Sequence, residues 1–168
     1  MIKSKMEKIC IKGMSKSCCG MKEMIILKSY FKTDPSLNMI YKATRDGFKA
    51  SDFHSKCDNK MKVLVIIKAK NYIFGGFTNQ GWNLKLVRFN FVNCNASFIF
   101  SLSNPHNKPS IFLPYEVTTV CYQRSSGPSF GQDISILDES NLKQYNFSNL
   151  GHTFISKKKK KIYSKFHS

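Results

Sequence analysis

Acidic residues are scarce in this chain. Its 168 residues include 10 Asp and Glu against 27 Lys and Arg, which gives a formal net charge of +17. The imbalance is greatest at the ends, since residues 1–32 hold eight Lys and two Glu, and residues 152–168 hold six Lys and no acid. Such ends favour contact with nucleic acid, anionic lipid or an acidic protein. The alternative is that they only solubilise the chain, and the shortage of arginine disfavours specific phosphate binding.

Long apolar runs are also missing. The longest candidates, Met24–Leu27 and Val63–Ile67, fall far short of the roughly 18 residues that a membrane-spanning helix needs. The first thirty residues contain lysines but no continuous apolar stretch. We therefore expect neither a transmembrane segment nor a secretory signal peptide.

Paired cysteine motifs are absent as well. No Cys-x-x-Cys occurs, and two of the six cysteines are adjacent, which makes a shared tetrahedral metal site unfavourable. Without a signal peptide, the thiols are expected to be free in a reducing compartment. We expect no metal and no other cofactor. The cysteines are Cys10, Cys18, Cys19, Cys57, Cys94 and Cys121.

The chain does contain abundant strand-forming sequence. Aromatic residues make up 13%, which excludes wholesale disorder and suits one globular domain. Val63–Ile67 is typical of a strand with both faces covered, and Tyr72–Thr78 is its expected hairpin partner. Further short strands are expected at 37–43, 96–102, 110–113, 117–122 and 133–137. Together they predict a mostly β (α+β) fold, a two-sheet antiparallel β-sandwich with short peripheral helices.

Helices and loops are expected between these strands. Ser51 is the expected N-cap of a short helix through Cys57, in which Phe53 and Cys57 share a buried stripe. A short helix is expected near Met21–Phe31, within an otherwise poorly ordered basic arm. The Gly, Ser and Pro residues of 124–131 indicate a loop.

Four segments together resemble the TLDc domain, the module of the oxidation-resistance protein family. They are YKATRDGFKASDFHSKCD (Tyr41–Asp58), YIFGGFT (Tyr72–Thr78), GPSFGQDI (Gly127–Ile134) and NFSNLGHTF (Asn146–Phe154). The resemblance divides the chain into an N-terminal arm at 1–36, a TLDc-like domain at 37–156 and a lysine-rich tail at 157–168. It gives a structural role to the motif residues Arg45, Asp46, Gly47, Phe48, Ser51, Phe53, His54, Gly75, Gly76, Gly127, Phe130, Gly131, Asn149 and Gly151.

The resemblance also implies a function. It points to a eukaryotic, intracellular protein that protects against oxidative stress without catalysis, so no catalytic residue is expected. Several family members bind the vacuolar proton-pumping ATPase, which makes this pump the leading candidate partner. The expected location is the cytoplasm, with the nucleus or an organelle membrane surface as alternatives.

The tail departs from the family pattern. Family members end with a strand of alternating apolar and acidic residues, whereas this chain ends with ISKKKKKIYSKFHS. We expect that the lysine run does not form a buried closing strand, because unpaired buried charges are very costly. The run can instead supply an electrostatic contact to nucleic acid or an anionic membrane. It comprises Lys157, Lys158, Lys159, Lys160 and Lys161.

Two enzymatic alternatives remain open at this point. His54 and Cys57 are neighbours on one helix face, and a histidine beside a cysteine can generate a reactive thiolate for redox chemistry. Ser129 in Gly-Pro-Ser-Phe-Gly has the spacing of a nucleophile elbow, but the strand expected after it disfavours that assignment. The Arg45-Asp46-Gly47 turn is a further candidate. It either binds a ligand or contains an Arg–Asp pair that only orders the loop.

Overall fold

The computed structural model describes residues 8–11, 19–80, 82, 90–93, 96–115, 118–122, 125–142 and 147–157. The helices are α1 (Met21–Lys28), α2 (Ala43–Asp46) and α3 (Ala50–Cys57). The strands are β1 (Lys8–Ile11), β2 (Tyr41–Lys42), β3 (Val63–Ala69), β4 (Tyr72–Thr78), β5 (Asn90–Asn93), β6 (Phe98–Ser103), β7 (Ser110–Pro114), β8 (Thr118–Tyr122), β9 (Ser126–Phe130), β10 (Ile134–Leu137), β11 (Phe147–Ser148) and β12 (Phe154–Ser156).

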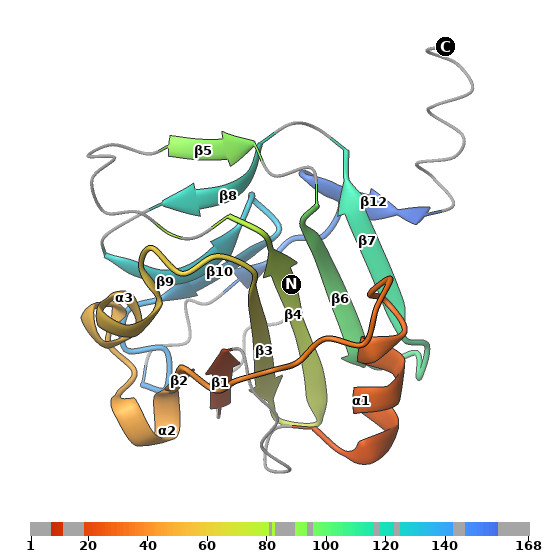
Figure 1. Ribbon diagram of the computed structural model, residues 1–168, viewed down its shortest axis with the longest axis horizontal. Coiled ribbons are helices and arrows are strands. Elements are labelled where there is room, and N and C mark those ends of the chain that lie inside the picture. The colour runs from red at the N-terminus through yellow and green to blue at the C-terminus, as the bar shows by residue number, and fades with distance from the viewer. Residues whose placement is uncertain are drawn as a thin grey trace.

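Antiparallel pairing joins these strands into sheets. The largest has the order β12-β7-β6-β4-β3-β1-β2, and it faces a three-stranded sheet of order β11-β10-β9. Strands β5 and β8 form a further pair. In Figure 1, α1 lies against one face of the large sheet, α3 lies beside β9, and α2 lies next to α3 and β2. The predicted mostly β fold of antiparallel sheets with short marginal helices is confirmed.

Strand β3 is buried on both faces, as its apolar sequence predicts. Val63, Val65 and Ile67 pack into one core, whereas Leu64 and Ile66 pack into the other. Successive strand residues point to opposite faces, so an unbroken apolar run requires cover on both sides. The hairpin to β4 is also confirmed, with Val63 paired to Thr78 and Ala69 to Tyr72.

The first core lies between the large sheet and the β9–β10 sheet. Trp82 and Phe130 are fully buried in it, and their rings meet edge to face at 5.9 Å. Phe53 and Cys57 of α3 belong to the same core, as expected for two residues one helical turn apart. This core fixes α3 against the sandwich.

Glycines in β4 allow the two sheets to approach closely. A Cβ on Gly76 would lie 2.7 Å from Cε1 of Phe130, and a Cβ on Gly75 would collide with the carbonyl oxygen of Val65. Glycine within a strand is typical of sites where another group packs against the backbone. The Phe130 ring therefore rests directly on β4.

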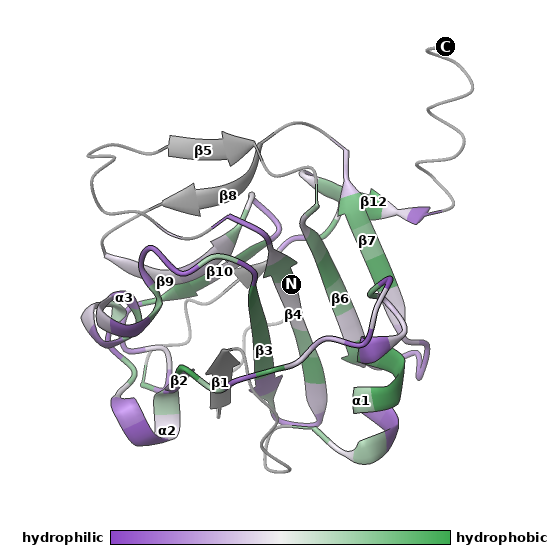
Figure 2. Ribbon diagram, viewed as in Figure 1, coloured by the Kyte–Doolittle hydropathy of each residue, from purple (hydrophilic) through white to green (hydrophobic). Residues whose placement is uncertain are grey.

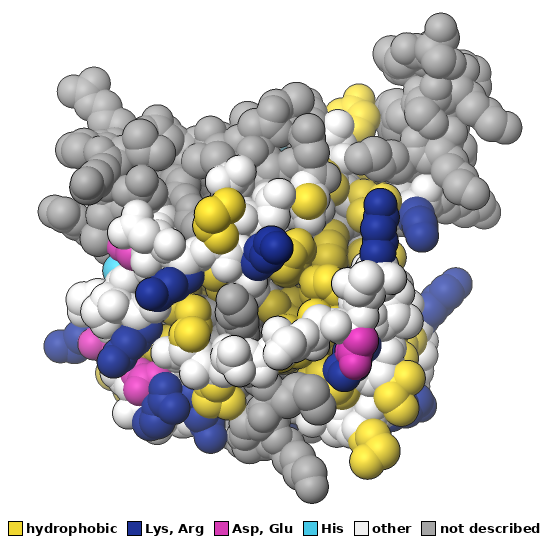
Figure 3. Space-filling model, viewed as in Figure 1, with side chains coloured by type: hydrophobic (Ala, Val, Ile, Leu, Met, Phe, Trp, Pro, Cys, Tyr) yellow, Lys and Arg dark blue, Asp and Glu magenta, His cyan; other side chains and the backbone are white. Residues whose placement is uncertain are grey.

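The second core lies on the opposite face of the large sheet. It joins Leu64, Ile66 and Phe100 to Met24 and Leu27 of α1. Hydrophobic colouring is concentrated on β3, β6 and β7 (Figure 2). Helix α1 covers only part of this face, and Figure 3 shows hydrophobic side chains at the surface beside it.

Part of the chain before residue 37, which was expected as a poorly ordered arm, forms regular structure. β1 lies between β2 and β3 in the large sheet. The helix expected near Met21–Phe31 is present at Met21–Lys28, and it buries Met24 and Leu27, which share a face because they are three residues apart. The burial of these two side chains holds the helix against the sheet, although the surrounding segment is rich in lysine.

Three local expectations need correction. Residues 126–130 were expected as part of a loop but form strand β9. Pro128 has no N–H to donate to a neighbouring strand, and the register shift between β9 and β10 accommodates it. The expected strand at 37–43 is limited to Tyr41–Lys42. Helix α3 begins two residues earlier than expected, with Lys49 rather than Ser51 at the N-cap.

The C-terminal tail is described only at its start. Strand β12 pairs with β7 at one edge of the large sheet, and the exposed Lys157 follows it. Lys158–Lys161 lie outside the described residues, so the expectation for the lysine run stays a prediction.

Candidate functional site

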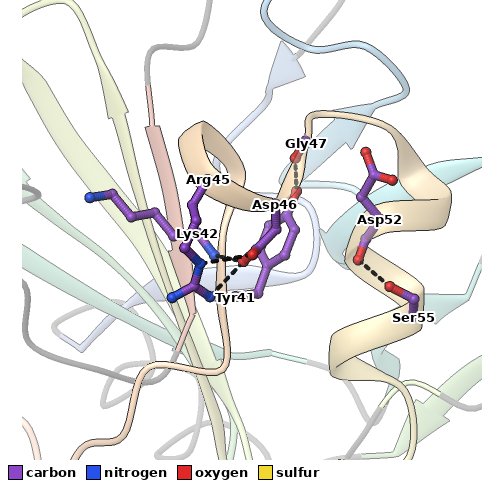
Figure 4. A network of polar contacts seen from close by, with 7 residues as sticks. All are labelled: Tyr41, Lys42, Arg45, Asp46, Gly47, Asp52 and Ser55. Atoms are coloured by element: carbon purple, nitrogen blue, oxygen red, sulfur yellow. Dashed lines mark hydrogen bonds and ion pairs between the residues drawn. The ribbon is translucent and has the colours of Figure 1, made fainter.

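The longest motif segment, residues 41–58, folds into a compact corner made by β2, α2 and α3 (Figure 4). The Tyr41 hydroxyl donates a 2.6 Å hydrogen bond to the carbonyl oxygen of Gly47. Burial raises the pKa of Tyr41, so the phenol stays protonated and continues to donate. Gly47 has φ +110°, and a Cβ there would collide with the Asp52 carboxylate. Glycine is therefore required at this turn.

Arg45 and Asp46 form a bidentate ion pair within the corner. The Arg45 Nε lies 2.8 Å from Oδ1 of Asp46, and Nη2 lies 2.7 Å from Oδ2. Asp46 Oδ2 also accepts a hydrogen bond from the Lys42 backbone N–H at 2.8 Å. The hydrogen bond from Arg45, supported by that of Lys42, lowers the pKa of Asp46 to about 2. Both charged groups thus order the turn.

Backbone contacts tie this corner to the β9–β10 side of the sandwich. The Ala50 N–H donates to Oδ1 of Asp138 at 2.7 Å, and the Glu139 N–H donates to the Phe48 carbonyl at 3.1 Å. At the start of α3, the Asp52 carboxylate accepts from the N–H of the N-cap residue Lys49 at 3.0 Å, as the N3 residue of a capping box does. Ser51 itself is exposed.

His54 connects α3 to β9. Its Nδ1 lies 2.7 Å from Oδ1 of Asp58, and its Nε2 lies 3.0 Å from the Ser126 carbonyl oxygen. The side chain is 6% exposed. Burial raises the pKa of Asp58 even though His54 acts in the opposite direction. Both ring nitrogens of His54 are engaged by oxygen atoms.

Cys57 lacks the environment of a reactive thiolate. Its side chain is fully buried, and burial raises the pKa of the thiol, with the negative charges of Asp58 and Asp46 adding to the effect. Reactive cysteines need the reverse, namely a lowered pKa and solvent access. The predicted proximity of His54 and Cys57 on α3 therefore does not create thiol chemistry at this position.

A second cluster, which sequence reasoning missed, joins the two C-terminal motif segments, 127–134 and 146–154, at Asp133. Its buried carboxylate accepts four backbone hydrogen bonds: Oδ1 from Gly151 (2.6 Å) and His152 (3.3 Å), and Oδ2 from Thr153 (2.6 Å) and Phe154 (3.2 Å). Its carbonyl oxygen accepts from the Asn149 N–H at 2.8 Å. We expected Asp133 to begin a strand, but it lies in the turn before β10. The sequence feature that could have identified this cluster is the single acidic residue within the GPSFGQDI motif.

Glycines shape the surroundings of Asp133. Gly131 has φ +53°, and a Cβ there would collide with the Thr153 side chain, whose hydroxyl accepts from the Gln132 N–H at 3.0 Å. Gly151 has φ +109°. Gly127 lies in β9, opposite Ile136. The structure thus places the motif residues in three groups: the α2–α3 corner, the Gly75–Gly76–Phe130 contact and the Asp133 turn.

Other candidate groups have structural positions. Ser129 is buried in strand β9, and its Oγ lies 3.2 Å from the Ser135 hydroxyl, so the strand-to-helix turn of a nucleophile elbow is not present there. His152 is exposed and contacts the Asn149 amide at 2.7 Å. His106 is exposed in a loop, and His167 lies outside the described residues.

The described residues show neither a metal-binding cluster nor a membrane-spanning helix. Among the residues that the structure describes, no group of three or more His, Cys, Asp and Glu side chains is arranged to hold a metal ion. Within the same part of the chain, none of the helices has the length and hydropathy needed to span a bilayer.

Comparison with known protein families relates this chain to the TLDc domain. The family model of the TLDc domain matches residues 16–167, which is nearly the whole chain and includes α1. The comparisons with curated proteins and with solved structures each gave no significant match. The family match agrees with the four motif segments and with the β-rich fold. The chain therefore belongs to the TLDc domain family.

Proposed function

We propose that this chain is a non-enzymatic protein-interaction module that acts in oxidative-stress protection. Membership of the TLDc family suggests the link to oxidative stress and to protein binding. The proposed partner is the vacuolar proton-pumping ATPase, which several members of the family bind. The contribution of this chain would be a folded surface that recognises the pump.

One observation carries the choice of binding over catalysis: the polar motif residues make their contacts within the fold. Arg45 and Asp46 pair with each other, Asp133 holds four backbone N–H groups, and His54 bridges Asp58 and Ser126. A catalytic site needs a nucleophile, a base and an orienting group that converge on open space. These residues instead build the scaffold on which a binding surface is displayed.

A second candidate function is supported by charge. The net charge of +17, with lysine-rich ends, favours a protein that binds nucleic acid or an anionic membrane surface. Binding of this kind weakens steeply as salt concentration rises, because it depends on counterion release. Salt dependence therefore separates this candidate from docking onto the pump through a shaped surface.

The test is a binding measurement with purified vacuolar proton-pumping ATPase, using the full chain at physiological salt. Saturable binding that survives a moderate increase in salt supports the proposal. Absence of binding to the pump, together with salt-sensitive binding to random-sequence DNA or to phosphatidylserine vesicles, would favour the second candidate. Truncation at Ser156 tests whether the lysine tail contributes.

A further inference from the structure

The face of the large sheet beside α1 carries an apolar row that is only partly covered. Phe77 of β4 pairs with Phe98 of β6, and the register of β6 with β7 places Leu113 opposite Phe98. These three side chains belong to the second core. Phe98 is buried, but Phe77 and Leu113 remain partly exposed at the two ends of the row. The row is therefore accessible from outside the fold.

Two aromatic side chains from the segment after α1 extend this row. The Phe31 ring lies 5.2 Å from the Phe77 ring and 5.4 Å from the Phe98 ring, in both cases edge to face, and the Tyr30 ring lies 6.3 Å from Phe98. Tyr30 and Phe31 are themselves only partly buried. We call the surface formed by Tyr30, Phe31, Phe77 and Leu113 the apolar face.

The apolar face is concave. In Figure 3 the hydrophobic side chains lie in a hollow between α1 and the strands, and dark-blue side chains border it. A concave apolar surface lined with aromatic rings accepts side chains that project from a partner, and aromatic residues dominate the energetics of protein interfaces. A bilayer requires the opposite shape, since apolar side chains must project into it.

Lysines flank the apolar face. Lys32 follows Phe31, Lys62 lies across from Asn79 at the end of β4, and Lys157 follows Ser156, the partner of Phe112 in β7. All three are exposed, and we call them the rim lysines. The acid nearest to Phe31 in sequence, Asp34, forms an ion pair with Lys28 at 2.8 Å. Exposed lysines therefore adjoin the apolar face on the backbone segments that bound it, beside one ion-paired acid.

We propose that the apolar face docks an amphipathic acidic segment of a protein partner. Apolar side chains of that segment would enter the hollow over Phe77 and Leu113, while its Asp and Glu side chains would meet the rim lysines. Complementary charge at an interface rim sets specificity and the rate of association. The proposal rests on the proposed function, since it names the surface through which this module binds and the chemistry of what it binds.

The docking proposal can be tested with peptides, without the vacuolar ATPase. A phage-displayed library of random 16-residue peptides is selected on the full chain, and the affinity of selected peptides is measured by fluorescence anisotropy. Peptides that combine acidic with apolar residues are expected. The double variant Lys32→Glu/Lys62→Glu should bind them about tenfold more weakly, because rim repulsion replaces attraction. Lys56→Glu, on the exposed side of α3, should bind as the wild type does.

An apolar variant tests the hollow itself. Leu113→Glu should weaken binding of the same peptides, whereas Leu142→Glu, at an exposed leucine of the β10–β11 connection, should not. Circular dichroism checks that each variant is folded, and a variant that fails this check is replaced by Phe77→Leu, which keeps the core apolar. Equal binding by the wild type and the face variants would overturn the proposal, as would selection of peptides without acidic residues.

Other occupants give different results. A self-associated protein that Leu113→Glu converts to a monomer in sedimentation would show that a second copy covers the face, and would overturn the proposal. Binding to phosphatidylserine vesicles that Lys32→Glu/Lys62→Glu abolishes, without any peptide binding, would do the same. Failure of the wild type to bind the pump would contradict only the proposed function, because the peptide measurement is independent of it.

Discussion

Asp133 offers the sharpest test of how the motif segments hold the fold together. Its side chain is fully buried and accepts four backbone N–H groups from residues 151–154. Asp133→Asn preserves the size of the side chain but replaces one oxygen with an NH₂ group, which donates and cannot accept. Whichever way the amide is oriented, two backbone N–H groups then lose their acceptor: the buried pair of Thr153 and Phe154, or the part-buried pair of Gly151 and His152.

The magnitude follows from those two N–H groups. A buried donor left without a partner costs about 1–3 kcal/mol. The free energy of unfolding should therefore fall by about 1–3 kcal/mol if the amide turns its NH₂ group towards the part-buried pair, and by about 2–6 kcal/mol if the buried pair loses its acceptor. That is a large share of the roughly 5–15 kcal/mol that a typical domain possesses. Urea unfolding followed by circular dichroism measures the change. The matched control is Asp34→Asn, which removes only an exposed ion pair and should cost less than about 1 kcal/mol.

The outcome can refute the reasoning directly. If Asp133→Asn lowered the free energy of unfolding no more than Asp34→Asn does, the 151–154 segment would not depend on the carboxylate. The two C-terminal motif segments would then need another explanation for their association. A change confined to the denaturant slope would instead indicate an altered unfolded state.

Four further predictions follow. Ile66→Ala should cost about 2–5 kcal/mol in urea unfolding, as large-to-small changes in packed cores do, and a loss below about 0.5 kcal/mol would place β3 outside the core. Because folding lowers the pKa of Asp46, this carboxylate stabilises the fold above its ordinary pKa, and the stabilisation is lost as pH falls towards about 2. Asp46→Asn should therefore remove this part of the acid dependence of the free energy of unfolding. Purified protein given peroxide and a thiol donor should show no multiple turnover, and turnover abolished by Cys57→Ser would contradict the non-enzymatic assignment. Amide exchange should be faster across 156–168 than across Val63–Ile67, whereas equal protection would identify the tail as a core strand.

The elements that sequence reasoning predicted well are those whose pattern is local. Val63–Ile67 reads as a doubly covered strand because each residue is apolar, and no distant contact is needed to recognise it. The hairpin partner follows from the short connection, and the buried stripe of α3 follows from the spacing of Phe53 and Cys57. In each case the signal lies within about ten residues of the chain, the window over which periodicity is informative.

The elements that it missed depend on contacts between distant segments. Strand β9 contains Gly127 and Pro128, which favour a loop locally, and its strand character comes from pairing with β10. The carboxylate of Asp133 finds its donors 18 to 21 residues further along the chain. The helix around Met24 and Leu27 was expected, but the burial of these two side chains could not be predicted locally, because it depends on the sheet face that α1 covers.

The same dependence on distant contacts explains why the TLDc motifs are informative about fold and much less so about chemistry. The Gly75-Gly76 pair and Phe130 come from separate motif segments, yet a side chain at residue 76 would displace the Phe130 ring from β4. Gly47 and Asp52 are matched in the same manner at the α2–α3 corner. Residues that fit one another so closely hold the two sheets and the α2–α3 corner in place. The recognition surface that we propose, the apolar face with its rim lysines, lies on the other face of the large sheet, over the second core.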